Sequence, residues 1–326
     1  MIEPIVELYR RMSTELPQDV ERALREARER EENDSPGRKA IETILENVRL
    51  ARERSRPLCQ DTGIPVFYVT RPLTTSEHEI KEAILSATRE ATRAGYLRPN
   101  AVDSVTGENS ADNVGVGFPI IHIREQDVAA GARRPVAFIR ADASDEEKRA
   151  FLKALNAKEE LGPFAGAQES VVIEAMLKGG GCENVGMRYR LPDASLRAAR
   201  DLEGVRRCVL AAVHAAQGRA CPPYVVGVAL GGARDSTAAL AKRQLLRTLD
   251  DASPLAPLAE LEAKLTDETN LLGIGPAGLG GRTTVLAVKA ASEHRHPASF
   301  FVEVSFGCWA MRRARAVIAQ TGVRYE

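Results

Sequence analysis

The sequence predicts a mixed α/β protein, with a helical N-terminal section followed by mixed β-sheets and surrounding helices. Two observations support this prediction. Apolar residues recur at helical spacing through residues 1–56, and from Ile64 onward strand-like runs alternate with helical patterns. With 326 residues, 44% of them hydrophobic, the chain can bury at least one sizeable core.

The helical section contains two stretches with the same period. Their apolar positions are Ile5, Leu8, Met12 and Leu16, and then Ile41, Ile44, Leu45 and Val48. Pro17 and the polar stretch 33–37 interrupt this pattern, so we expect separate helices on either side of each interruption.

The remaining elements follow Pro57, where IPVFYVT introduces a strand-like run. Ser76 and Glu79 form a capping-box pattern that begins a helix ending near Arg93. Further strands are predicted at 116–123, 135–140, 171–177, 187–189, 225–230, 283–288 and 300–304, and further helices at 145–157, 194–216, 236–249 and 256–271. The late basic residues Arg312, Arg313 and Arg315 are interpreted as the exposed face of a helix. No linker composition divides the chain, so residues 1–326 are predicted to form a single domain.

The charge balance excludes some classes of partner. Forty-five basic residues match forty-five acidic ones, so no overall field attracts nucleic acid or an anionic membrane. No apolar run has the length of a signal peptide or of a membrane span. We therefore expect a cytoplasmic protein with neither a nucleic-acid nor a membrane partner.

Five cysteines are present, without a CxxC pair, and disulfides are not expected in such a chain. Cys59, Cys221 and Cys308 share a setting, because each lies at the edge of a predicted strand beside a glycine, a proline or a small polar residue. Loops at strand edges can converge, and three thiolates would leave one iron of a cluster open to a substrate. Spacing alone does not predict iron, however. From the residues alone, separately packed cysteines remain the simpler interpretation.

Four other residues could take part in chemistry. Asp61 could move a proton near Cys59, or it could only stabilise a turn. The glycine triplet that ends at Gly181 could offer N–H groups to an anion, or it could be a flexible turn. Arg98 could hold a carboxylate, although an exposed arginine needs no such role. His296 could orient a substrate or bind zinc, but no third zinc ligand stands nearby in the sequence.

Several short motifs occur in one order along the chain: CQDTG, KGGG followed by a small residue and EN, ACPPY with a later GG, GLGG, and RHPAS before a strand and GC. Together they resemble the α-type domain of class I fumarases and the α subunit of L(+)-tartrate dehydratase, over about residues 40–320. The resemblance implies a hydro-lyase that reversibly dehydrates a 2-hydroxy dicarboxylic acid. The substrate pairs that it suggests are malate and fumarate or tartrate and oxaloacetate, with mesaconate behind them.

The resemblance also implies roles for individual residues. Cys59, Cys221 and Cys308 would hold a [4Fe-4S] cluster, which leaves Cys182 and Cys208 as non-ligands. Gln60, Arg98 and Gly181 would bind substrate, and Asp61 and His296 would be catalytic. Two departures from the family pattern stand out. Cys182 replaces the usual serine, and the interval from Cys59 to Cys221 is long, consistent with an insertion at about residues 130–165.

In single-chain relatives, a C-terminal β-type domain contributes basic carboxylate-binding residues and a catalytic hydroxyl. This sequence stops at Glu326 without one, so the resemblance implies a separate β-type subunit. Pairs of α and β chains with two-fold symmetry are then the expected assembly.

Three alternatives remain open at this point. A cluster-bearing chain could have lost catalysis and act as a sensor or assembly partner. A zinc or thiol enzyme would use Cys59 with His296. A purely structural α/β module would need none of the cysteines for its role.

Overall fold

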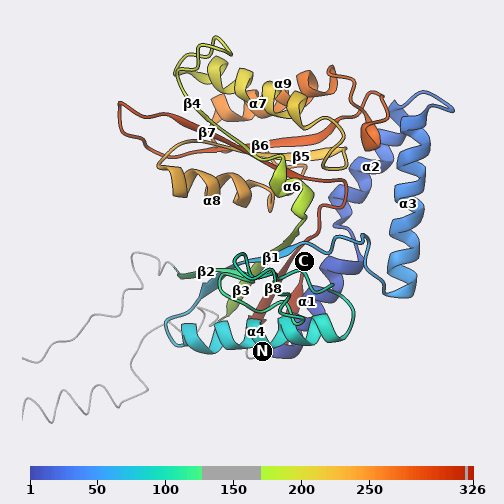
Figure 1. Cartoon of the computed structure of the whole chain (residues 1–326), viewed down its shortest axis with the longest axis vertical. Helices are drawn as coiled ribbons and strands as arrows, with labels where there is room; N and C mark the ends of the chain where they lie inside the picture. Colours follow the sequence, from blue (N-terminus) through green and yellow to red (C-terminus); the bar gives the residue numbers. More distant parts are fainter. Residues whose placement is uncertain (127–169, 320–321) are drawn as a thin grey trace, which may run out of the picture.

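The computed structural model describes residues 1–126, 170–319 and 322–326, and it confirms the mixed α/β class. Two β-sheets form the centres of two lobes, and the N-terminal helices run along the side of both (Figure 1). Among the residues described, no helix has both the length and the apolar composition needed to cross a membrane.

The N-terminal section is helical, as predicted. Its helices are α1 (Ile2–Thr14), α2 (Gln18–Arg30) and α3 (Pro36–Arg54). Pro17 separates the first two helices, and the Ser35 hydroxyl caps the third by accepting a hydrogen bond from the Arg38 N–H at 3.1 Å. The helix boundaries are therefore set locally.

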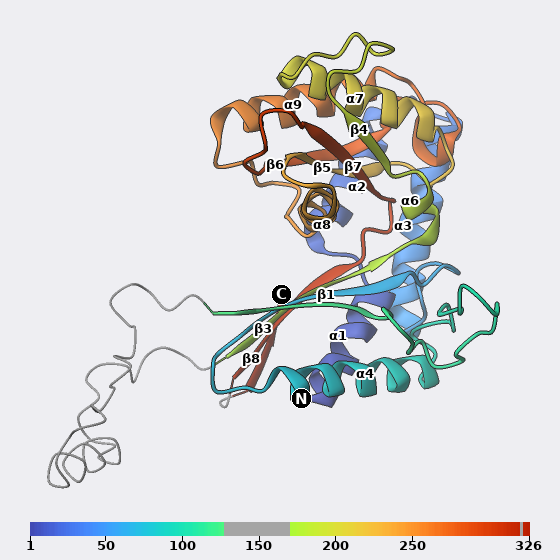
Figure 2. The ribbon, with the colours of Figure 1, turned by 60° about the vertical axis from the view of Figure 1, so that its left-hand side comes forward.

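The lower lobe contains a five-stranded sheet in the order β2-β1-β3-β8-β9. Its strands are β1 (Ile64–Arg71), β2 (Ile120–Glu125), β3 (Val171–Lys178), β8 (Arg313–Ala319) and β9 (Gly322–Tyr325). Alternate residues of β1 serve two cores: Phe67 and Val69 pack with α1 and α4 (Glu77–Arg93), whereas Val66 and Tyr68 pack with α2 and α3. The second of these cores also includes Val225 and Leu245 of the upper lobe, so it joins the lobes. Helix α3 runs alongside this junction (Figure 2).

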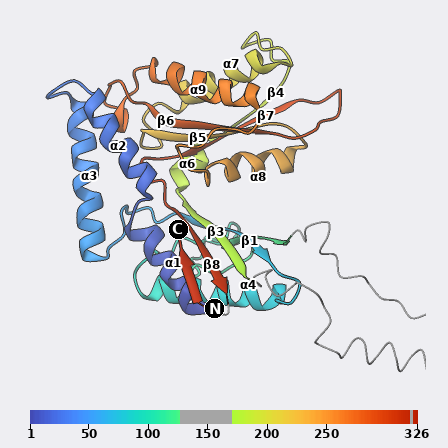
Figure 3. The ribbon, with the colours of Figure 1, turned by 180° about the vertical axis from the view of Figure 1, so that it is seen from behind.

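The upper lobe contains a four-stranded sheet in the order β4-β7-β5-β6. Its strands are β4 (Met187–Arg190), β5 (Tyr224–Gly231), β6 (Val285–Ser292) and β7 (Phe301–Gly307). Helices α7 (Leu202–Ala216) and α9 (Ala256–Asn270) cover one face, and α8 (Arg234–Gln244) covers the other (Figure 3). Strand β5 is buried along its whole length, which explains its nearly continuous apolar sequence.

One prediction is wrong. Arg312, Arg313 and Arg315 do not form the exposed face of a helix, because the chain continues into β8, which lies between β3 and β9. Arg312 and Arg313 are buried. Arginine and alanine alternate in residues 313–316, which is the period of a strand. The basic side chains nevertheless led to the prediction of a solvent-exposed helix face.

Other differences concern boundaries. The helix predicted at 194–216 begins at Leu202, because the Asp201 carboxylate caps it by accepting a hydrogen bond from the Gly204 N–H at 2.7 Å. The helix predicted at 236–249 corresponds to α8, which ends at Gln244. The strand predicted at 116–123 corresponds to β2, which begins at Ile120. The strand at 135–140, the helix at 145–157 and the insertion at 130–165 lie outside the described residues.

Candidate functional site

The strand register places the predicted site loops side by side. Ile64, the first residue of β1, pairs with Lys178, the last residue of β3, so the CQDTG loop lies beside the glycine triplet. In the upper sheet, Val225 of β5 pairs with Gly307 of β7. The antiparallel pairing therefore puts the loop that carries Cys221 next to Cys308.

A second set of contacts joins these two pairs of loops. The Cys182 thiol donates to the Ala220 carbonyl at 3.8 Å, and the Arg312 Nη1, four residues after Cys308, donates to the Asp61 carbonyl at 2.6 Å. Within the upper pair, the Trp309 N–H donates to the Cys221 carbonyl at 3.2 Å. Cys182 belongs to the short helix α6 (Gly180–Asn184), which follows the end of β3. Four loops that are distant in the sequence thus meet between the two sheets.

Solvent exposure separates the five cysteines into two groups. Cys182 and Cys208 are buried, whereas Cys221 is exposed and Cys59 and Cys308 are partly exposed. All five are free thiols. The three predicted ligands are therefore the ones that an incoming group could reach.

The thiols of the predicted ligands also influence one another. Burial raises the pKa of the Cys221 thiol, and the charges of Cys308, Cys59 and Asp61 raise it further. Negative charges that are gathered in this way repel one another unless a cation joins them. Iron ions bound by the three sulfur atoms would deprotonate the thiols and offset this repulsion.

Cys182 contacts one of the predicted ligands directly. A hydrogen bond from Cys182 lowers the pKa of the Cys308 thiol to about 6; burial acts against this shift, and the charge of Arg312 supports it. The same hydrogen bond and its own burial raise the pKa of Cys182. The two thiols therefore influence each other, while the geometry directs the Cys182 S–H toward the Ala220 carbonyl at 3.8 Å.

Two backbone N–H groups fix the carboxylate of Asp61. Its Oδ1 accepts a hydrogen bond from the Gly63 N–H at 2.9 Å, and its Oδ2 accepts one from the Gly180 N–H, also at 2.9 Å. The first bond is the local turn expected from the sequence. The second links the CQDTG loop to the glycine triplet. The anion that the Gly180 N–H binds is thus the Asp61 carboxylate of this protein.

Arg98 lies beside Gln60 through contacts that the sequence did not indicate. The Arg98 Nη1 donates to the Gln60 carbonyl at 3.2 Å, and the Arg98 N–H donates to the Thr62 hydroxyl at 3.0 Å. Asn113, which is 15 residues further along the chain, is buried, and its side chain donates to the Arg98 carbonyl at 2.7 Å. Thr62 and Asn113 thus position a loop whose arginine is itself exposed.

His296 is not part of this cluster. It lies in the loop between β6 and β7, where Ser299 donates back to its carbonyl. Cys308 follows the opposite end of β7, and seven residues of strand span about 20 Å. Gly181, in contrast, lies within the cluster, next to Gly180 and close to the Arg219 carbonyl.

The surroundings of the cysteines bear on whether an anionic iron–sulfur cluster fits here. In the described part of the chain, no group of three or more His, Cys, Asp or Glu side chains is arranged to hold a metal ion. The buried Lys178 Nζ and Arg312 Nε nevertheless have no hydrogen-bond partner there. Three accessible thiols in loops near two buried cations suit a thiolate-bound iron–sulfur group, whose overall charge is negative, better than a single bound ion.

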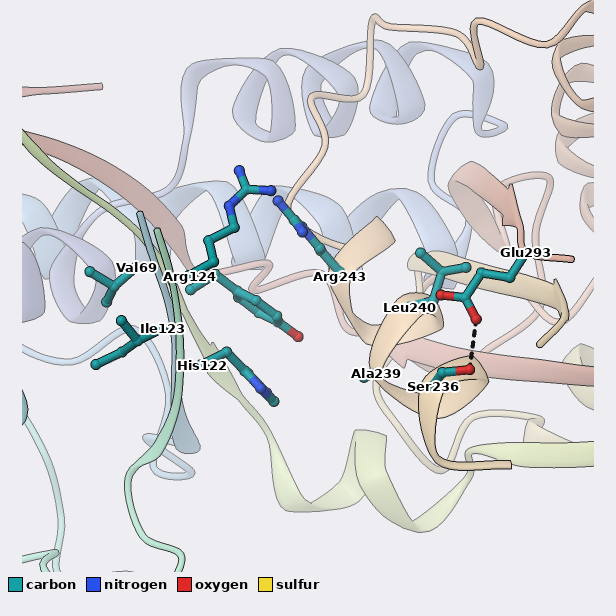
Figure 4. Close-up of a pocket in the computed structure, with 10 residues that line it drawn as sticks. Val69, His122, Ile123, Arg124, Ser236, Ala239, Leu240, Arg243 and Glu293 are labelled. Atoms are coloured by element: carbon teal, nitrogen blue, oxygen red, sulfur yellow. Dashed lines mark hydrogen bonds between the residues drawn. The ribbon is translucent and has the colours of Figure 1, made fainter. Parts of the chain in front are cut away.

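A separate cleft of about 300 Å³ lies between β1, β2 and α8. His122 and Arg124 line it from β2, and Ser236 of α8 donates a hydrogen bond to Glu293 at 2.6 Å (Figure 4). None of the predicted site residues lines this cleft. The cleft is thus distinct from the cysteine cluster.

Comparison with known proteins gives consistent matches. The family model described as fumarate hydratase (fumerase) matches residues 2–165 and 160–317. A putative class I fumarate hydratase of Geobacillus stearothermophilus is 39% identical over 96% of this chain, which spans 54% of that relative. A putative L(+)-tartrate dehydratase subunit alpha of Methanocaldococcus jannaschii is 33% identical over 95% of the chain and 94% of the relative. The L(+)-tartrate dehydratase subunit alpha of Escherichia coli K12 is 31% identical over 94% and 87%.

Proposed function

Because this chain belongs to the fumarate hydratase family of hydro-lyases, we propose that it is the iron–sulfur α subunit of an enzyme that reversibly dehydrates a 2-hydroxy dicarboxylic acid. The proposed substrate pairs are malate and fumarate or tartrate and oxaloacetate, and mesaconate ranks below both pairs. A cytoplasmic location belongs to the same proposal, because a reducing compartment keeps thiols available for iron.

The observation behind this proposal is the arrangement of the loops. Those that carry Cys59, Cys221 and Cys308 lie near a carboxylate whose orientation two backbone hydrogen bonds fix. Cys59, Cys221 and Cys308 come from separate loops, and the charge of Asp61 acts on Cys221 together with those of the other two cysteines. An elimination of water needs a centre that accepts the leaving hydroxyl and a group that moves a proton. The cluster of loops offers donors for the first and a carboxylate for the second.

Cys59, Cys221 and Cys308 would hold a [4Fe-4S] cluster. When bound, such a cluster supplies an open iron that acts as a Lewis acid toward a hydroxyl or carboxylate oxygen. Cys182 would not be a ligand, because its thiol is buried and is directed toward the Ala220 carbonyl. Cys208 is buried in the core of the upper lobe, away from this role.

Asp61 would be the proton-transfer group that this chain contributes. Each of its oxygens accepts one backbone hydrogen bond, which holds the carboxylate in one orientation and leaves lone pairs free to bind a proton. Orientation of this kind matters because proton transfer requires hydrogen-bond reach to the substrate carbon or hydroxyl. We propose that Asp61 shares the proton transfer with a group from a second chain.

Arg98, Gln60 and Gly181 would bind the substrate. The exposed Arg98 guanidinium can hold a carboxylate with two parallel hydrogen bonds, and the Gly181 N–H can bind another carboxylate oxygen. Thr62 and Asn113 keep the Arg98 loop in place beside Gln60. The chain therefore supplies one side of a dicarboxylate site.

We propose that a separate β-type subunit supplies the other side. The chain spans nearly all of two relatives named as α subunits, but only 54% of the class I fumarate hydratase. The remaining part of a fumarase would correspond to the partner. A two-fold symmetric assembly of αβ pairs is the proposed form.

His296 keeps a catalytic role in this proposal only if another chain brings its loop to a cysteine site, because the loop lies at the far end of β7. The same separation opposes the alternative of a zinc or thiol enzyme that uses Cys59 with His296 from one chain. A sensor or assembly role remains the second candidate, since a complete dicarboxylate site needs more residues than this cluster provides.

The test is anaerobic purification of the chain with and without the proposed β-type subunit, followed by iron and sulfide analysis. Turnover of malate, fumarate and both tartrate enantiomers is then measured. The proposal expects about four irons per chain and activity only when both subunits are present. Iron without turnover in the complete complex would favour the sensor, and absence of iron from anaerobic protein would reject the cluster.

A further inference from the structure

Arg312 is among the largest side chains that this protein buries completely, with 1% of its surface exposed. Its Nη1 donates to the Asp61 carbonyl at 2.6 Å, but its Nε has no hydrogen-bond partner among the residues described. No carboxylate in that part of the chain forms an ion pair with it. A guanidinium is always charged, so burial in this state is costly unless a further anion is present.

The neighbouring arginine shows how the same fold supplies a buried cation with a counter-charge. Arg313 is 8% exposed, and it forms an ion pair with Asp19 and a hydrogen bond to the Leu246 carbonyl at 3.1 Å. The two arginines are adjacent and both are buried, yet only Arg313 has a carboxylate partner within the described residues. Each guanidinium keeps one buried N–H group without a hydrogen-bond partner, Nε in Arg312 and Nη1 in Arg313, so it is the missing carboxylate that is specific to the position of Arg312.

That position is the centre of the predicted site. A Cβ atom built on Gly179 would lie 3.9 Å from the Arg312 Nη2, 3.8 Å from the Cys182 thiol and 3.1 Å from the Asp61 Oδ2. The backbone of Arg312 is tied in as well, because the Leu177 N–H donates to its carbonyl at 2.9 Å. Arg312 thus contacts the CQDTG loop and the end of β3, and it follows Cys308 by only four residues.

A second buried cation lies in the same region. Lys178 is 2% exposed, and its Nζ has no hydrogen-bond partner in the described structure. Its closest carboxylate is that of Glu183, with an N–O distance of 3.9 Å. Among the described residues Arg312 has no ion-pair partner and Lys178 has only a distant one, and the charge of Cys308 acts on Lys178, so a further anionic group fits between these cations.

We propose that Arg312, assisted by Lys178, compensates the negative charge of the thiolate-bound cluster and thereby sets how readily that cluster accepts an electron and how firmly it is retained. This inference rests on the proposed function. Arg312 is a positioning residue here, because it acts on the cluster through charge and through the loops that it joins. A nearby cation stabilises the more negative, reduced form, so it raises the reduction potential.

The experiment compares four forms of the full chain, prepared anaerobically with its β-type partner: wild type, Arg312→Met, Arg312→Lys and Arg315→Met. Arg315 is the matched control, since it lies in the same strand but is partly exposed and pairs with Glu326. The readouts are iron and sulfide content after gel filtration and the midpoint potential of the cluster from a redox titration followed by electron paramagnetic resonance.

Arg312→Met is expected to retain less iron and to shift the midpoint potential of its remaining cluster to a lower value. Arg312→Lys should restore the potential toward that of wild type, and Arg315→Met should change neither readout. If Arg312→Met does not fold, Lys178→Met carries the same prediction with a smaller shift. Circular dichroism of the cluster-free proteins identifies that case.

Two results would overturn the inference. In the first, Arg312→Met holds as much iron as wild type at the same potential. In the second, both the methionine and lysine variants lose iron while the residual cluster keeps the wild-type midpoint potential. Arg312 would then only hold the loops together and would have no effect on the charge of the cluster. If wild type itself holds no iron, the proposed function fails first and this inference fails with it.

Discussion

The Asp61 carboxylate accepts a hydrogen bond from the Gly180 N–H at 2.9 Å, although 119 residues separate them in the chain. This bond ties the loop before β1 to the loop after β3. It also gives Asp61 a fixed direction, because the Gly63 N–H holds the other oxygen from within the same turn. The predicted proton-transfer group and the predicted anion-binding glycines are thus parts of one structure.

Replacement of Asp61 by asparagine tests its proposed role in proton transfer. The amide oxygen can still accept one backbone hydrogen bond, so we expect the fold and the iron content to persist. Turnover by the complete complex should fall by about 10²- to 10⁴-fold, because the amide cannot take a proton. Steady-state kinetics measures this loss.

Asp103→Asn is the matched control, since Asp103 also accepts two backbone hydrogen bonds in a turn but is exposed on another loop. If turnover falls equally in the two variants, or if Asp61→Asn keeps nearly wild-type turnover, Asp61 is not the proton-transfer group.

The cluster assignment predicts different results for different cysteines. Serine at Cys59, Cys221 or Cys308 should cause loss of most of the iron and sulfide from anaerobically prepared protein, because each variant removes one thiolate ligand. Alanine at Cys208 should leave the iron content unchanged, since this thiol lies in the core between α7 and the upper sheet. Iron and sulfide assays decide between these expectations, and full iron content in any one of the serine variants would exclude that cysteine as a ligand.

Gly179 offers a test of the space around the Asp61 carboxylate. Its backbone has φ −61° and ψ 141°, which alanine can adopt without strain. The added Cβ would nevertheless lie 3.1 Å from the Asp61 Oδ2, closer than ordinary van der Waals contact, so the carboxylate must move. We expect Gly179→Ala to lower the turnover number by about tenfold or more, as small displacements of catalytic groups do.

The thermal unfolding temperature should change little in the same variant. Gly115→Ala is the control, because nothing lies within 4 Å of its added Cβ. Wild-type kinetics in Gly179→Ala would show that the position of Asp61 tolerates displacement.

The dependence of stability on pH can be tested away from the cysteines, at Asp251. Burial alone would raise the pKa of this carboxyl, but hydrogen bonds from Arg247 and Lys289 outweigh burial and lower it below its usual 3.8. Its contribution to stability is therefore present above about pH 4 and is lost as the pH falls through the lower, folded-state pKa. We expect Asp251→Asn to be less stable than wild type near neutral pH, by on the order of 1 kcal/mol for such a half-exposed pair.

Below pH 4 the difference in stability should shrink, and the two proteins should converge once the pH is below the folded-state pKa of Asp251. Urea unfolding at several pH values measures both effects. The neighbouring Asp250→Asn serves as control, since its partner Arg22 forms an exposed pair of little energetic value. A constant difference between wild type and Asp251→Asn at all pH values would contradict the assignment.

Much of the fold could be predicted locally. The periodicity of residues 1–56 predicted helices that the structure contains as α1 to α3, and the capping pattern at Ser76 predicted the start of α4. Helix capping and side-chain periodicity depend on residues a few positions apart, so a sequence displays them directly. The role of β8 escaped prediction because arginines are rarely buried, and only the surrounding structure makes Arg312 and Arg313 interior residues.

The sequence by itself determined the family, the fold class and a set of motifs that carry the chemistry. Only the tertiary structure decided which of these residues meet. Strand register placed Cys221 beside Cys308 and the CQDTG loop beside Gly180, and it left His296 at the opposite end of β7. The physical reason is that antiparallel pairing brings together residues remote in sequence, and that pairing depends on the packing of whole sheets rather than on any short motif.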